Sequence, residues 1–397
     1  MNNIKYQLAS NSWNIEEHDA IKKVLLSEKL TMGSEVKKFE DQISEFHGVK
    51  HAIMVNSGSS ANLIGASAMT YVRAKNFKPI AKRGVVIAPA VSWSTTYFPF
   101  IQLGYEIVLV DVDENFNISI AELEKYLDDR CVGIISVNLL GVSADNEKLQ
   151  KICKERNLFL FEDNCESFGA KLSDKVCGSF GDVGTLSFFF SHHLQTMEGG
   201  MILTDCDNIA NYARSLRAHG WVRDGNYDAL IAESDMDEFD SLFKFILPGY
   251  CVRPLEMSGA VGQVQLKKWD QQCHYRQANA ELFQARAKNA SYLTWQKSIG
   301  SPTWFGFGCI FNDIDKNKRL DLFKYLKSVG IESRPIVAGN FANQPVCKSL
   351  GIVSAGDLKQ ANRIDNSGMF FGNDGIELSN QIDYLFDKLD TFFTDMN

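Results

Sequence analysis

The sequence has little that would indicate a secreted, disulfide-bonded or metal-bound protein. Its 397 residues include nine cysteines, an odd number, and no two of them form a C-x-x-C pair. Disulfide frameworks and zinc cages normally need paired, regularly spaced cysteines. The N-terminus lacks the charged-then-apolar pattern of a signal peptide, and no apolar run approaches the roughly 18–20 residues that cross a bilayer. We therefore expect a cytoplasmic protein with no membrane segment and no bound metal.

Basic residues are scarce relative to acidic ones. The chain carries 41 lysines and arginines against 49 aspartates and glutamates, which gives a net charge of −8. Non-specific nucleic-acid binding needs a basic surface, so no nucleic-acid partner is expected. An anionic small ligand remains compatible with this charge, because a few local arginines can hold a phosphate.

Short apolar segments alternate with helical patterns in the first part of the chain. Strands are expected at residues 52–55, 85–88, 107–110, 132–137, 158–161, 185–189 and 201–204. Helices are expected at residues 16–26, 35–46, 61–73, 121–127 and 146–155. Buried strands that alternate with helices are typical of βα units, so the sequence predicts an α/β fold with a mostly parallel sheet flanked by helices.

The pattern changes after Pro254. A proline-free helical stretch covers residues 255–290, and a strand at 304–311 and a helix at 318–329 follow. We expect a large domain over residues 1–253, and a connecting helix with a smaller α+β domain over residues 254–397. The acidic stretch 224–240 is expected to be a surface loop.

Small residues follow the first expected strand. Residues 56–62 read Asn-Ser-Gly-Ser-Ser-Ala-Asn and lead into a helix, where backbone N–H groups and the helix N-terminus can hold an anion. A tight turn with a serine cap explains the same pattern equally well. The segment is neither G-x-x-x-x-G-K-[ST] nor G-x-G-x-x-G, so ATP and NAD are not the expected ligands.

Two further strand ends carry an aromatic or acidic side chain. Trp93 follows the strand at 85–88, where its indole could stack on a flat ring or cover the sheet edge. Asp163 and Glu166 follow the strand at 158–161, at the edge where open α/β sheets bind ligands. A carboxylate there could pair with the protonated ring nitrogen of pyridoxal phosphate, although acidic strand ends are common.

The segment 184–200 makes the chain recognisable. It reads Gly-Thr-Leu-Ser-Phe-Phe-Phe-Ser-His-His-Leu-Gln-Thr-Met-Glu-Gly-Gly and resembles the sugar aminotransferase family of fold-type I pyridoxal-phosphate enzymes. That family acts on nucleotide-linked 4-keto sugars and carries a Ser-Phe, a lysine five residues after the serine, and a Glu-Gly-Gly. Here His192 occupies the lysine position. No lysine lies between Lys175 and Lys244, so a displaced lysine cannot bond the cofactor covalently.

The likeness is closest to family members that remove the C3 hydroxyl of a 4-keto-6-deoxy sugar. It extends over residues 6–13, 30–33, 88–96, 137–141, 162–167, 187–201, 217–221, 247–259 and 334–341. It implies the fold-type I aminotransferase architecture, a homodimer, and pyridoxal or pyridoxamine phosphate held non-covalently. The implied partners are a nucleotide-diphospho sugar and glutamate as amino donor.

The resemblance also implies roles for individual residues. His192 would be the proton-transfer base, since an imidazole with an ordinary pKa near 6.5 can accept and return a proton; His193 would be a packing residue. The implied cofactor ligands are Ser57, Gly58, Ser59 and Ser187 for the phosphate, Trp93 and Asp163 for the ring face and its nitrogen, and Glu166 near the ring oxygen. The candidates for the nucleotide and sugar are Arg217, His219, Trp221, Arg223, Arg253 and Arg334, although a single arginine is more often a surface ion pair.

One position departs from the family pattern. Cys251 stands where relatives place an asparagine that reaches the phosphate of the second subunit. A thiol is a much weaker donor than an amide, so that contact does not carry over to Cys251.

Other functions stay open at this point. A dehydrase or aminotransferase for another nucleotide sugar is one alternative, and a non-catalytic sugar-nucleotide binder is another, although a binder would not need the retained cofactor residues. A related CDP-sugar dehydrase draws electrons from an iron–sulfur centre, which needs clustered thiolates. Cys206, Cys251, Cys273 and Cys309 are dispersed along the sequence. The nucleotide base, the sugar stereochemistry and the amino donor are not specified by the residues.

Overall fold

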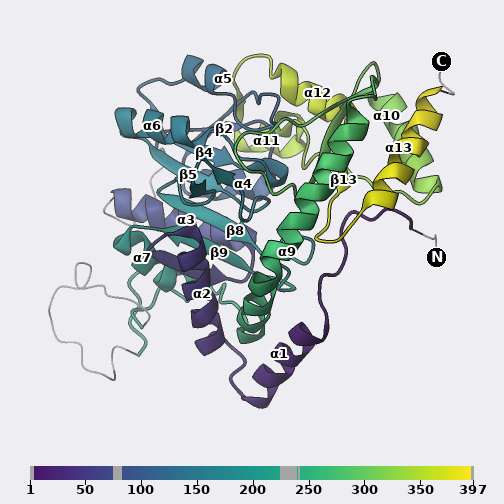
Figure 1. The fold of residues 1–397 in the computed structure, drawn as a ribbon. Coiled ribbons are helices and arrows are strands. Elements are labelled where there is room, and N and C mark those ends of the chain that lie inside the picture. Colours follow the sequence, from purple (N-terminus) through teal and green to yellow (C-terminus); the bar gives the residue numbers. More distant parts are fainter. Residues whose placement is uncertain (1–3, 75–82, 224–238, 240–241, 395–397) are drawn as a thin grey trace.

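An eight-stranded sheet organises the larger part of the molecule (Figure 1). The computed structural model describes residues 4–74, 83–223, 239 and 242–394, so the acidic stretch 224–240 lies outside the described residues except at 239. In spatial order the strands are β1 (His51–Val55), β9 (Gly200–Thr204), β8 (Val183–Ser187), β5 (Phe159–Asp163), β4 (Cys131–Val137), β2 (Val85–Pro89), β3 (Glu106–Val110) and β12 (Val353–Ser354). β9 is antiparallel to both of its neighbours, and the neighbouring strands from β8 to β12 are parallel. The predicted mostly parallel α/β sheet is confirmed.

Helices cover both faces of this sheet, because its central strands are buried on both sides. α3 (Gly58–Ala74), α4 (Ser94–Gln102) and α7 (Asp207–Arg217) pack on one face and bury Tyr97, Phe100 and Leu216. α5 (Ile120–Lys125) and α6 (Asn146–Arg156) pack on the other. α2 (Ser34–His47) and the start of α9 (Glu256–Ala287) cover its β1–β9 end.

The smaller part is built around a three-stranded sheet. Its strands are β10 (Leu293–Trp295), β11 (Gly306–Phe311) and β13 (Gly368–Gly372). The surrounding helices are α10 (Lys316–Ser328), α12 (Lys359–Ser367) and α13 (Ser379–Thr394), whereas α11 (Pro345–Leu350) buries Cys347 in the core of the larger part. α9 runs diagonally between the two parts, and α1 (Ile15–Leu26) packs against it (Figure 1).

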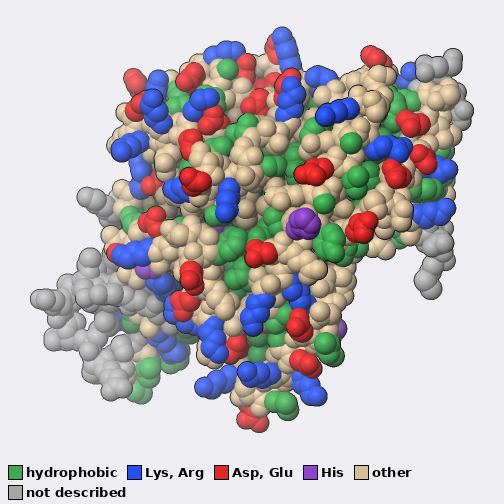
Figure 2. Space-filling model, viewed as in Figure 1, with side chains coloured by type: hydrophobic (Ala, Val, Ile, Leu, Met, Phe, Trp, Pro, Cys, Tyr) green, Lys and Arg blue, Asp and Glu red, His purple; other side chains and the backbone are tan. Residues whose placement is uncertain are grey.

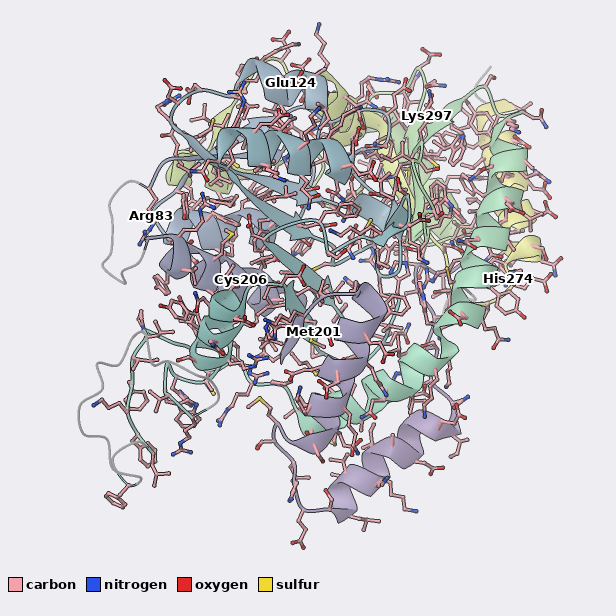
Figure 3. The ribbon with its side chains drawn as sticks, turned by 60° about the vertical axis from the view of Figure 1, so that its left-hand side comes forward. Arg83, Glu124, Met201, Cys206, His274 and Lys297 are labelled. Carbon is pink, nitrogen blue, oxygen red and sulfur yellow. The ribbon has the colours of Figure 1, made fainter. Side chains whose placement is uncertain are left out.

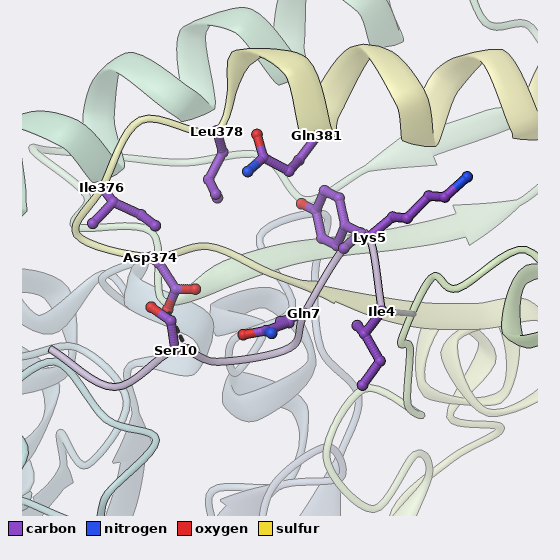
Figure 4. A pocket seen from close by; sticks show the side chains of 9 residues that line it. Ile4, Lys5, Gln7, Ser10, Asp374, Ile376, Leu378 and Gln381 are labelled. Atoms are coloured by element: carbon purple, nitrogen blue, oxygen red, sulfur yellow. Dashed lines mark hydrogen bonds between the residues drawn. The ribbon is translucent and has the colours of Figure 1, made fainter. Parts of the chain in front are cut away.

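Two segments cross the proposed division at residue 254. β12 comes from the C-terminal part but pairs with β3 at the edge of the large sheet. Tyr6, near the other end of the chain, is buried in the core of the smaller part. Beside it, residues 4–10 line a small hollow whose far wall includes Asp374 and Gln381 (Figure 4). The two parts are therefore connected by the N-terminal segment around Tyr6 and by β12 from the C-terminal part.

The surface carries mixed charge, and the sheet lies inside. Acidic and basic side chains are interspersed over the face shown in Figure 2. Met201 of β9 is buried, whereas His274 of α9 and Lys297 are exposed (Figure 3). Within the described ranges, no helix combines the length and apolar character needed to cross a membrane.

Some boundaries differ from the sequence prediction. α4 was not expected, because Pro99 lies inside it. α7 was also missed. The strand expected at 185–189 ends at Ser187, because Phe188 N donates to Gly199 O and Thr196 N donates to Phe188 O, which closes a loop. His192 therefore lies on this loop and not on a strand.

Candidate active site

A cavity of about 300 Å³ opens where the carboxyl ends of β1, β2, β4, β5 and β8 meet, the edge at which α/β sheets bind ligands. Its volume is at the lower end of the range of small-molecule sites. Nine residues singled out from the sequence line it: Ser57, Gly58, Ser59, Trp93, Asp163, Glu166, Ser187, His192 and Arg334. The fold thus collects them from segments far apart in the chain.

One wall of the cavity is the N-terminus of α3. Ser57 caps the helix, with its Oγ accepting from Ser60 N at 3.1 Å. A Cβ atom at Gly58 would lie 2.6 Å from Ser187 Cβ, so only glycine allows the helix to approach β8 this closely. Backbone N–H groups and the partial positive charge of a helix start can together hold a phosphate.

Asp163 lies at the floor of the cavity in a fixed orientation. Its Oδ2 accepts from Asn62 Nδ2 at 2.9 Å and from Thr96 Oγ1 at 2.7 Å, and its Oδ1 accepts from Cys165 N at 3.2 Å. Asn62 is itself held by Thr185, whose Oγ1 donates to Asn62 Oδ1 at 2.7 Å. A carboxylate held in this way is suited to face a ring N–H⁺.

Asn62 and Thr96 were not singled out from the sequence, although both line the cavity. Asn62 lies one helical turn after Gly58, and that spacing is the signal that could have identified it.

Trp93 and Glu166 present contrasting groups to the same cavity. The Trp93 side chain is 58% exposed, so its apolar face is available to a flat ligand and does not simply cover the sheet edge. Glu166 Oε2 accepts from Leu140 N at 3.2 Å. Burial, reinforced by the nearby Asp163 charge, raises the pKa of Glu166 to about 7, so this carboxyl can hold a proton near neutral pH.

His192 has no partner for its buried Nδ1 atom. Its ring packs edge-on against Phe305 and Phe189, at centroid distances of 5.1 and 5.9 Å. Burial, followed by the charges of Arg334 and Arg276, lowers the pKa of His192 to about 4, below the ordinary value expected from the sequence. The imidazole is therefore neutral near pH 7 and can accept a proton. Among the described lining residues of this cavity there is no lysine.

His193 does not line the cavity. It is buried between Trp269 and Phe305, at ring distances of 5.4 and 5.5 Å.

The remaining predicted substrate residues lie outside the cavity. Arg217 is buried, and its Nη1 donates to Glu40 Oε1 and to Met54 O, both at 2.8 Å. An arginine engaged in this way is not free to bind a nucleotide within this protomer.

The other three candidates, His219, Arg223 and Arg253, surround Trp221 in a cluster of cations and rings. The guanidinium of Arg223 lies 4.3 Å from its ring centre, that of Arg253 lies 5.9 Å away, and the rings of His219 and Trp221 are 5.1 Å apart. The cluster adjoins the phosphate wall, because Asn56 N donates to Val252 O at 3.0 Å.

Comparison with known proteins adds to this geometry. A profile of the DegT/DnrJ/EryC1/StrS aminotransferase family matches residues 12–372. The GDP-4-keto-6-deoxy-D-mannose 3-dehydratase of Yersinia pseudotuberculosis is 42% identical over 390 residues, which cover 97% of this chain and 98% of that protein. A crystal structure of a mutant GDP-4-keto-6-deoxymannose-3-dehydratase with bound GDP-perosamine superposes with a TM-score of 0.91 at 42% identity, covering 97% of this chain and 100% of that one. Another, with a trapped PLP–glutamate geminal diamine, has a TM-score of 0.90 at the same identity and coverage.

Proposed function

Because the chain belongs to the DegT/DnrJ/EryC1/StrS aminotransferase family, we propose that its cavity binds pyridoxal or pyridoxamine phosphate without a covalent bond. The residues fit that cofactor. Gly58 leaves a cradle at the start of α3, Asp163 is oriented for a ring nitrogen, and Trp93 offers an exposed indole. His192 lines the same cavity and completes the set in place of a lysine.

The proposed reaction is the C3 dehydration of GDP-4-keto-6-deoxy-D-mannose to GDP-4-keto-3,6-dideoxy-D-mannose, with glutamate as amino donor. One observation carries this proposal. His192, whose imidazole is neutral near pH 7, lines the cavity at the sequence position where the aminotransferases of this family have the lysine that bonds the cofactor. The similarity to 3-dehydratases at 42% identity over nearly the full length supports the substrate class.

Each residue then has a defined task. When bound, pyridoxamine phosphate supplies an amine for the C4 ketone and a conjugated ring that draws electrons away from the reacting carbons. His192 accepts a proton on its ring nitrogen and returns it later in the cycle, as a positioned general base and acid. Asp163 keeps the ring nitrogen protonated, and Ser57, Gly58, Ser59 and Ser187 hold the phosphate. Trp93 fixes the ring plane, and Glu166 holds a proton beside the ring oxygen.

The nucleotide is proposed to bind across a homodimer. His219, Trp221, Arg223 and Arg253 form a cation–aromatic cluster outside the cavity of their own protomer, so a second copy is needed to bring such a cluster over a cavity. Exposed apolar side chains beside the site are available to bury, with Phe190 at 50% and Phe245 at 57% exposure. Arg334 would meet the sugar or diphosphate from within the cavity. Light scattering that finds an active monomer would contradict this assembly.

A reducing, cytoplasmic location is part of the proposal. All nine cysteines are free in the structure, as expected where thiols stay reduced. Within the described part of the chain, no group of three or more His, Cys, Asp and Glu side chains is placed to hold a metal, which does not favour the iron–sulfur-dependent alternative.

The decisive experiment incubates the protein with pyridoxal phosphate, glutamate and GDP-4-keto-6-deoxy-D-mannose. The expected product is lighter by one oxygen atom in mass spectrometry, and equal amounts of 2-oxoglutarate and ammonia appear with it, because the nitrogen of glutamate does not stay on the sugar. An aminated sugar as the stable product would instead make the protein an aminotransferase. An unchanged sugar nucleotide, with no conversion of glutamate, would favour a non-catalytic binder.

A further inference from the structure

The His192 ring is held differently from most histidines that transfer protons. Such a histidine usually donates one ring N–H to a carboxylate or carbonyl, which fixes the ring and its tautomer. Here Nδ1 is buried without any partner, so no hydrogen bond on that side orients the imidazole. The orientation must come from packing, and the rings in contact are Phe305 and Phe189.

These two rings differ in how firmly they are held. Phe189 is 39% exposed and lies on the loop of His192 itself. Phe305 comes from the C-terminal part and lines the cavity. Its ring touches His192, His193 and Phe370, at centroid distances of 5.1, 5.5 and 5.9 Å. Because the Phe305 ring contacts both histidines and also Phe370 of the smaller sheet, its own position is fixed and it can hold the His192 ring in place.

The backbone around Phe305 is hydrogen-bonded to the turn at residues 139–141, which follows β4 of the large sheet. Phe305 N donates to Leu140 O at 3.0 Å, and Thr303 N donates to Gly141 O at 2.9 Å. A Cβ atom at Gly141, where φ is 84°, would lie 2.4 Å from the nitrogens of both Trp304 and Phe305, so a larger residue would push the segment away. Leu140 N in turn donates to Glu166, which ties this clamp to the cavity.

A buried arginine holds the other side of the same segment. Arg276 of α9 donates from Nη1 to Phe305 O at 3.3 Å and to Trp304 O at 3.4 Å, and it also contacts Asn373 O. Trp304 has a φ of 45°, a strained value for a residue with a side chain. Such strain persists only where the surroundings enforce it, and it concentrates at functional sites.

We infer that Phe305 is a positioning residue for the reaction: its clamped ring orients the His192 imidazole and shields it from water, in place of the usual hydrogen-bond partner. The inference rests on the proposed function only in taking His192 as the base. The charged and titratable groups around His192 are Arg334, Arg276, His193, Asp163, Glu166 and Glu198. Changing Phe305 removes none of these charges, so an effect on the His192 titration reports packing and hydration and not the loss of a charged neighbour.

The test compares Phe305→Leu with Phe370→Leu in the full-length protein. Phe370 supports the same segment and undergoes the same loss of a ring, but it does not touch His192. We expect Phe305→Leu to lower kcat by roughly 10- to 100-fold with little change in KM, because small misplacements of a reacting group cost about this much. Phe370→Leu should stay within about threefold of wild type.

A second measurement follows the imidazole itself. In histidine-labelled protein without sugar nucleotide, the NMR signal that disappears in His192→Asn identifies His192. Its pKa should rise toward the ordinary value near 6.5 in Phe305→Leu, because water reaches the ring, and should not move in Phe370→Leu. If Phe305→Leu does not fold, Phe305→Met is judged by the same criteria, since it fills a similar volume without a rigid ring.

Two results would overturn the inference. One is an unchanged kcat and an unchanged His192 titration in Phe305→Leu. The other is an equal loss in both leucine variants, which would make Phe305 part of general packing. Failure of the proposed function is distinguishable, because the wild-type protein would then form no dideoxy sugar, whereas the titration of His192 in Phe305→Leu still tests the packing role.

Discussion

Replacement of His192 by asparagine tests the central chemical claim. Asparagine keeps a polar side chain at the cavity wall but cannot take up a proton. General acid–base catalysis contributes on the order of 10²–10⁴-fold, so kcat should fall by at least that factor, equivalent to about 3–5 kcal/mol of transition-state stabilisation. Cofactor binding should survive, because Gly58, Ser187, Trp93 and Asp163 are untouched.

The pH dependence of the wild-type activity is a second quantitative test of His192 as the base. With the pKa of His192 at about 4, about nine-tenths of the imidazole is still neutral at pH 5, whereas an ordinary histidine would be only about 3% neutral there. As the pH is lowered, kcat/KM, which reports the free enzyme, should therefore fall to half its maximum near pH 4. The corresponding midpoint for kcat should be at a higher pH, because a bound anionic substrate offsets the charge of Arg334 and so raises the pKa of His192.

The assay follows product formation at saturating and at low sugar nucleotide between pH 4 and 8. His193→Asn is the matched control: the neighbouring imidazole does not line the cavity, so kcat should change by no more than a few-fold even if stability falls. His192→Lys should bind pyridoxal phosphate covalently and fail to make the dideoxy sugar. Wild-type dehydration by His192→Asn would refute the assignment and move the base to His193 or to water.

Three further outcomes follow from the structure. Borohydride should leave the cofactor unattached to the wild-type chain, since none of the described residues that line the cavity is a lysine, and a reduced adduct on a lysine in mass spectrometry would contradict this. Gly58→Ala should weaken cofactor binding by about tenfold or more in a spectroscopic titration, because the new Cβ would lie 2.6 Å from Ser187 Cβ. Burial lowers the pKa of His47 to about 4, so the unfolded chain binds the extra proton first as the pH falls below 6.5. Stability should drop by about 2–3 kcal/mol between pH 7 and pH 4.5 through this group, and denaturant titrations of His47→Gln should show a correspondingly weaker pH dependence.

Much of the architecture could be predicted from local sequence patterns. The βα rhythm predicted the strands to within a few residues, because burial on both faces of a parallel sheet demands continuous apolar runs. The same rhythm places the residues after β1, β2, β5 and β8 at one edge, since parallel strands end together. The motif around His192 was recognised because its residues and their spacing resemble the pattern of a known family.

Other features depend on contacts that no local pattern records. The sequence offered Arg217 as a substrate ligand, but the fold buries it against Glu40, which is 177 residues away in the chain. Nothing in the local sequence marks Asn62 and Thr96 as partners of Asp163, but the fold brings both side chains to its carboxylate. Phe305 carries no sequence signal, and it becomes important only where the smaller part of the chain meets the loop of His192.

There is a physical reason why some features could be predicted from the sequence and others could not. Periodic burial and strand order act within one element or between neighbours, so the residues themselves determined the sheet, its binding edge and the histidine in place of lysine. The partner of each buried polar group, the lowered pKa of His192 and the ring that orients it depend on which distant segments share a desolvated volume. Only the tertiary structure decides that, because hydrogen-bond partners and desolvation are properties of the packed arrangement and not of a stretch of chain.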